Sequence, residues 1–174
     1  MTPHAFGQVL ATWHDFFLAA AGATAALLGL LFVGVSINLS AIAADERVDL
    51  RTRAAQAFAN LVFVLVVSLL MLVPDPDPSF IAVGLGAVAA VGLVRIGQNV
   101  RTLLRGRRPA RSMLPTFRRI GWTAVADVIL AFTAGRIWQT SGAAEVIPNL
   151  IAVVFVLLIG AADIAWEMLT EVSR

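Results

Sequence analysis

The sequence contains no cysteine and no lysine, and only 14% of its residues are charged. Without cysteine, neither a disulfide framework nor a thiolate metal site can form. A soluble domain of this length carries about 25% charged residues, whereas this chain is 59% hydrophobic with a mean hydropathy of +0.87. The composition therefore indicates an integral membrane protein in contact with a lipid bilayer.

Side chains suited to catalysis are also scarce. The two histidines, His4 and His14, precede the first long apolar stretch, so no Ser–His or Glu–His set is available within the membrane. His4, His14 and Asp15 carry metal-binding atoms, but polar residues at a membrane boundary are more often simply interfacial. We expect no enzyme activity, no metal site and no bound cofactor.

Five apolar stretches follow one another along the chain, each near the length of about 20 residues that crosses a hydrocarbon core. The connections between them are too short to hold a soluble domain. The sequence therefore predicts an all-α fold, a single transmembrane domain over residues 1–174. Its five helices are expected at about 13–42, 54–73, 80–100, 120–138 and 147–168.

The arginines predict the orientation of this bundle. Segments 43–53 and 101–119 hold three and seven arginines, whereas the other two connections and the N-terminal segment hold none. Because arginine-rich loops stay in the cytoplasm, we expect the N-terminus outside and the C-terminus inside. The protein would be a multi-pass protein of a bacterial inner (plasma) membrane. Its basic segment Arg101–Arg119 would bind anionic lipid, and no binding of nucleic acid is expected.

Small residues mark one face of the first apolar stretch. Gly22, Ala26, Gly29 and Ser36 follow one another at steps of four, three and seven residues, which places them on the same side of a helix. Small faces allow membrane helices to approach closely. We therefore predict that Gly22, Ala26 and Gly29 are helix-packing positions and that the other helices pack around this one.

Several polar residues lie within the apolar stretches, where they are costly and usually face protein or water. We single out three charged residues, Arg95, Asp127 and Asp163. At a rise of 1.5 Å per residue, the flanking arginines place Arg95 and Asp127 in the cytoplasmic half of the membrane, and Asp163, about one turn before Glu167, lies at a similar level. Three neutral residues fall in the same layer: Asn60, Ser36 and Asn38. Every helix would then contribute a polar group to it.

Two interpretations of this layer remain open. In the structural one, Arg95 pairs with Asp127 or with Asp163, and the polar groups only fix the register of the bundle. In the functional one, Arg95 neutralises one aspartate while the other binds a proton or a cation, with the neutral side chains as further ligands. One arginine beside two aspartates leaves one carboxylate for such a ligand.

Residues Trp13 to Leu39 follow the pattern W-x2-F-F…G-A-x-A-A-L-x-G-L-x-F-V-x-V-S-I-N-L, which includes Ser36 and Asn38. This pattern resembles the first helix of a group of small bacterial membrane proteins of unassigned activity. The resemblance implies a multi-span bacterial membrane protein and gives no substrate and no site residues. Some members of the group are labelled as modulators of a membrane-bound AAA protease.

Two classes of function follow from these observations. The first is a small ion or proton transport element. A homo-oligomeric channel is favoured over a monomeric carrier, because an odd number of helices leaves no inverted repeat. The second is a non-transporting accessory that regulates or assembles another membrane complex, such as a membrane protease. Its small-residue faces would then bind the membrane-protein partner.

Overall fold

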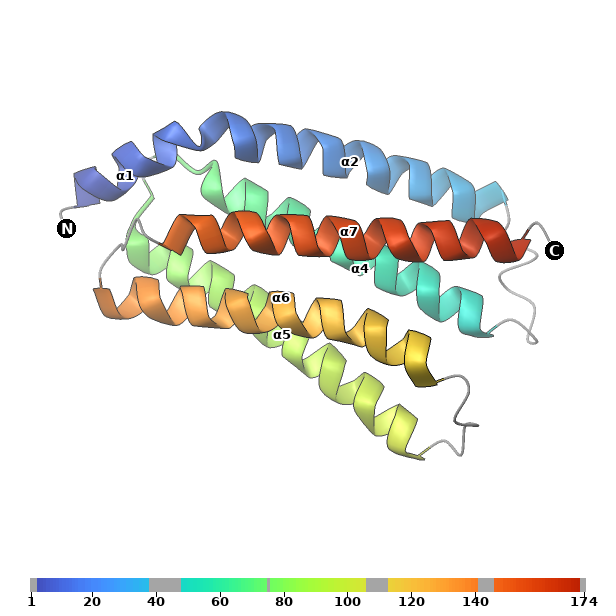
Figure 1. The fold of residues 1–174 in the computed structure, drawn as a ribbon. Coiled ribbons are helices and arrows are strands. Elements are labelled where there is room, and N and C mark those ends of the chain that lie inside the picture. The colour runs from blue at the N-terminus through green and yellow to red at the C-terminus, as the bar shows by residue number, and fades with distance from the viewer. Residues whose placement is uncertain (1–2, 38–47, 75, 106–112, 141–145, 173–174) are drawn as a thin grey trace.

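The computed structural model describes residues 3–37, 48–74, 76–105, 113–140 and 146–172. These ranges contain helices and no strands, so the all-α prediction is confirmed. In the described residues, the short helix α1 is followed by five long helices, which run side by side between the two ends of a bundle (Figure 1). The helices are α1 (Pro3–Thr12), α2 (His14–Ile37), α4 (Val48–Met71), α5 (Pro78–Arg105), α6 (Met113–Thr140) and α7 (Ile147–Val172).

The two ends of the bundle differ in charge. Helices α4 and α6 begin where α2, α5 and α7 end, and the C-terminus lies at that same end, opposite the N-terminus (Figure 1). Arginines occur in the first turns of α4 and in the last turns of α5, at positions that include Arg51, Arg53 and Arg101. We call this end of the bundle the arginine-rich end.

Four helices of the described residues are long and apolar enough to cross a membrane: His14–Ile37, Arg51–Met71, Pro78–Gln98 and Ile147–Trp166. Large apolar side chains also point outward, as at Leu30, which is 69% exposed. Such a surface is typical of a protein embedded in lipid. Helix α6, which covers the fourth predicted span and carries Asp127 and Arg136, is not among these four.

Helices α4 and α7 form the centre of the bundle. They pack against each other, with α2 against α4 on one side and α6 and α5 on the other (Figure 1). Their facing side chains are branched aliphatic residues that are almost completely buried, such as Val64, Val67, Val153 and Leu157. Since lipid is as apolar as these side chains, close van der Waals packing rather than the hydrophobic effect holds the helices together.

The prediction that the other helices pack around the first one is wrong. Helix α2 lies at the edge of the bundle and buries Phe17, Ala20, Ala21 and Thr24 near its beginning. Its small-residue face lies on the opposite side. No heavy atom comes within 4 Å of a Cβ built at Gly22 or Gly29, and Ala26 is exposed. Within this chain, these three predicted packing positions face outward.

Local rules explain where α1 and α5 begin. Pro3 and Pro78 each occupy the first position of a helix, where the missing N–H group of proline has no consequence. The Oδ1 atom of Asp77 accepts a hydrogen bond of 2.9 Å from the backbone N–H of Ser79, so Asp77 caps α5. The cap starts this helix two residues before the predicted span 80–100. Helix α1 was not predicted.

Candidate functional site

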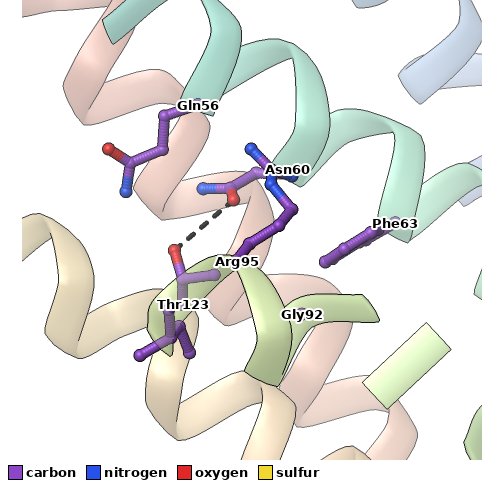
Figure 2. A pocket seen from close by; sticks show the side chains of 7 residues that line it. Gln56, Asn60, Phe63, Gly92, Arg95 and Thr123 are labelled. Carbon is purple, nitrogen blue, oxygen red and sulfur yellow. Dashed lines mark hydrogen bonds between the residues drawn. The ribbon is translucent and has the colours of Figure 1, made fainter. Parts of the chain in front are cut away.

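A small cavity lies between α4, α5 and α6 (Figure 2). The positions of its lining residues along these helices place it in the half of the bundle nearer the arginine-rich end. Its volume is about 10 Å³, which is the size that holds a single water molecule. The lining residues come from one face of each helix, because they recur at steps of three or four residues. They are Gln56, Asn60 and Phe63 of α4, Gly92, Arg95 and Ile96 of α5, and Thr123 of α6.

Asn60 connects three helices at this cavity. Its side chain is 2% exposed, and its Oδ1 atom accepts a hydrogen bond of 3.4 Å from the Thr123 hydroxyl (Figure 2). On its other side lies Gly160 of α7, where an added Cβ would stand 3.5 Å from the Asn60 Nδ2 atom. A methyl group there would make an ordinary van der Waals contact, so α7 lies beside the Asn60 amide with room for about one methyl group.

Replacing Thr123 by valine is expected to lower the free energy of unfolding by about 0.5–1 kcal/mol, because the Asn60 oxygen loses this donor while the side-chain volume hardly changes. Thr133→Val on the same helix is the matched control, since the Thr133 hydroxyl donates within α6, to the Ile129 carbonyl at 2.7 Å. Thermal unfolding in detergent compares the two variants. Equal losses would show that the bond between α4 and α6 adds no stability.

Asp127 is the most deeply enclosed charged residue of the site. It is 1% exposed, and its Oδ2 atom has no hydrogen-bond partner among the residues that the structure describes. The carboxylate lies directly against the backbone of α5 at Gly92, where an added Cβ would overlap its atoms. Thr123 stands one helical turn before Asp127, so both residues face the same region between the helices.

Arg95 lies beside these residues without a direct ion pair. Its side chain is half-buried, and its Cζ atom is 5.7 Å from the centroid of the Phe63 ring, which allows a cation–π contact. Attraction to the Asp127 carboxylate acts at longer range. Within the described residues, no carboxylate oxygen is within 4.0 Å of its guanidinium nitrogens. The aspartate that interacts with Arg95 is therefore Asp127, through space.

The remaining predicted site residues are placed differently. Asp163 is half-buried on α7, one turn after Gly160, and it is not without a partner. Ser36 is exposed on α2 and donates a hydrogen bond of 2.8 Å to the Phe32 carbonyl of its own helix. Asn38 lies outside the described residues. The structure thus brings Asn60, Arg95 and Asp127 together, and α2 contributes no described residue to the cavity.

Sequence reasoning missed five of the lining residues: Gln56, Phe63, Gly92, Ile96 and Thr123. A signal existed for two of them, because Gln56 and Thr123 stand four residues before Asn60 and Asp127 and so share their helix faces. No signal in the sequence marks the contact between Gly92 and Asp127. It depends on how α5 and α6 are rotated against each other.

The site combines one enclosed carboxylate, one arginine and three hydrogen-bonding side chains. Within the described ranges, no three histidine, aspartate or glutamate side chains converge where a metal ion would bind. Such a set can hold a proton or a small ion. Comparison of the chain with protein-family models, curated proteins and solved structures finds no significant match. The function is therefore inferred from the site itself.

Proposed function

We propose that all five long helices cross the inner membrane of a bacterium, with the N-terminus outside and the arginine-rich end in the cytoplasm. The outward face of α6 supports a fifth crossing, because Val125, Val128 and Phe132 are exposed while Asp127 is buried. Tryptophans support the two boundaries. Trp13 and Trp138 lie near one end of the bundle, and the exposed Trp166 lies near the other.

We further propose that the protein is a small transport element for protons or ions and that Asp127 is its binding group. The observation that carries this proposal is the enclosed Oδ2 atom of Asp127, which has no hydrogen-bond partner in the part of the chain that the structure describes. Burial of an ionised carboxylate without a partner is costly, so binding a proton there relieves a large penalty. The nearby charge of Arg95 opposes a metal cation. A proton is therefore the best-supported ligand of Asp127.

The packing of the bundle supports access to Asp127 from one side. The cavity beside it lies toward the arginine-rich end. Toward the other end, apolar side chains such as Leu85, Leu130, Ile137 and Leu150 are buried in the core of the described part. An open groove of about 350 Å³ also lies there between α5 and α6, but its lining, which includes Ala89, Leu93 and Ala134, is apolar. One chain in this arrangement has Asp127 next to a polar cavity on one side and apolar surroundings on the other. This favours a carrier that changes its access over a permanently open pore within one chain.

The test is proton flux into liposomes that contain the purified protein and a pH-sensitive dye. Asp127→Asn is expected to abolish the flux, because the amide keeps the shape of the side chain and cannot take up the proton. Asp77→Asn is the matched control, since Asp77 is exposed and asparagine also caps a helix. Asp163→Asn tests whether the second aspartate contributes. Unchanged flux in Asp127→Asn would contradict the proposal.

A second candidate is the accessory that binds another membrane protein, or a second copy of this chain, without transporting anything. The observation that favours it is the outward-facing small-residue side of α2, with Gly22, Ala26 and Gly29. Another helix can approach such a face closely. Well-folded protein that carries no proton or ion in liposomes, but that co-purifies with one defined membrane complex, would favour this candidate.

A further inference from the structure

The cavity beside Asn60 has the chemistry of an anion site. Its polar lining consists of Arg95, Asn60, Gln56 and Thr123, and it contains no carboxylate. Arg95, Asn60 and Gln56 carry N–H donors, while the Thr123 hydroxyl donates to the Asn60 oxygen and holds that amide in place. In Figure 2 these four side chains, from three different helices, gather around the same space. A positive guanidinium and convergent donors in a site of low dielectric constant favour a negative ligand over a positive one.

Arg95 supplies a second, independent indication that the cavity binds an anion. Among the described residues, its guanidinium has no ion-pair partner within 4.0 Å, although it lies inside a membrane-crossing helix. A charged side chain at such a depth is normally paired. The Phe63 ring at 5.7 Å attracts the cation but leaves its net charge in place. An anion in the adjoining cavity would neutralise it.

The volume of the cavity limits the size of the ligand. About 10 Å³ accommodates one particle the size of a water molecule. A chloride ion is somewhat larger than a water molecule, so the lining side chains would move apart slightly to admit it, whereas acetate, sulfate or a nucleotide is much larger still. Phe63 and Ile96 complete the wall. An apolar boundary on these sides suits a weakly hydrated monatomic anion better than a polyatomic one.

We propose that this cavity binds a halide-sized anion, held by Arg95 and Asn60, and that the anion is taken up together with a proton on Asp127. A bound anion cancels the positive charge that favours the ionised form of Asp127, so each ligand strengthens the binding of the other. Together the two ligands add no net charge to the membrane interior. The role of Asp127 in this coupling rests on the proposed function, whereas anion binding at Arg95 does not.

Other charged groups lie on the helices that pack around the cavity. Asp163 of α7 and Arg53 of α4 are half-buried, and neither is without a partner. Arg136 of α6 is exposed near the opposite end of the bundle. Arg95 and Asp127 are therefore the pair on which a change of charge in the cavity acts most directly.

The experiment titrates the purified full-length chain with sodium chloride in weakly buffered detergent solution, against sodium gluconate at the same ionic strength. Tryptophan fluorescence and thermal stabilisation report binding of the anion, and a pH indicator reports uptake of protons. We expect uptake of about one proton per chloride bound. Once the pH is high enough to remove the proton, the apparent affinity should fall about tenfold per pH unit.

The variants separate the two ligands. Arg95→Gln should weaken chloride binding at least about tenfold, the equivalent of about 1.4 kcal/mol. Arg101→Gln is the control, because Arg101 is exposed on the same helix. Asp127→Asn should still bind chloride but lose both the proton uptake and the pH dependence. If Arg95→Gln does not fold, Arg95→Lys keeps the charge and should retain weakened, proton-linked binding.

Three results would overturn the proposal: wild-type protein that binds no chloride, chloride binding that both Arg95 variants leave unchanged, or binding without uptake of a proton. These outcomes are distinct from failure of the proposed function. Proton-linked binding without any flux would contradict transport and leave the anion site standing. Proton flux that does not depend on chloride, with no chloride bound, would contradict the anion site alone.

Discussion

Replacing Gly92 by alanine is expected to lower the free energy of unfolding by about 3 kcal/mol or more, because the new methyl group would overlap the carboxylate of Asp127. Both carboxylate oxygens and the Cγ atom stand where the methyl carbon would go. Asp127 is 1% exposed, so its side chain cannot simply turn toward water. Helices α5 and α6 would have to separate, which would also disturb the cavity between them.

Gly97→Ala provides the control on the same helix. No heavy atom lies within 4 Å of a Cβ built at Gly97, and alanine is preferred over glycine inside a helix by about 1 kcal/mol. This variant should therefore be as stable as the wild-type protein or more so in thermal unfolding. In the double variant Gly92→Ala with Asp127→Ala, removal of the carboxylate should recover most of the loss. A cost at Gly92 no greater than at Gly97 would show that the close contact is absent.

The sequence predicted the helices better than their arrangement. The length of each apolar stretch and the arginines at alternate connections define where helices lie along the chain and which ends share one side. The position of α2 did not follow, because a face such as Gly22, Ala26 and Gly29 indicates that a close approach is allowed without specifying the helix that makes it. In this chain α2 instead buries a face around Phe17 and Thr24.

For the polar site too, the sequence predicts the depth of each residue in the membrane but not the rotation of its helix. Asn60, Arg95 and Asp127 could be assigned to one layer because the rise per residue fixes their depth in the membrane. Their side chains meet only because α4, α5 and α6 are each rotated toward one cavity. Ser36 was assigned to the same layer, but it points away from the bundle on α2. A prediction from depth alone therefore assigns residues to the site whose side chains point elsewhere.

Replacing Arg95 by alanine is expected to lower the free energy of unfolding by about 2 kcal/mol. This is less than the roughly 3–5 kcal/mol that follows when one partner of a buried direct ion pair is removed. Two interactions are lost, namely the attraction to Asp127 and the contact with the Phe63 ring. The ring contact contributes about 0.5–1 kcal/mol of this loss. Phe63→Leu does not measure it cleanly, because Phe63 is 8% exposed and its ring also packs in the apolar core. The attraction to Asp127 accounts for the remainder.

The electrostatic part is measured by a double-mutant cycle with Asp127→Asn in thermal or denaturant unfolding. Because the amide carries no charge, the cost of Arg95→Ala should fall by about 1 kcal/mol in that background. An unchanged cost would mean that Arg95 extends to the membrane boundary and does not act on Asp127.

The stability of Asp127→Asn alone separates the two interpretations of the polar layer. A carboxylate retained only for helix register should leave a less stable protein when neutralised, whereas one retained for binding should leave a more stable protein that no longer takes up its proton.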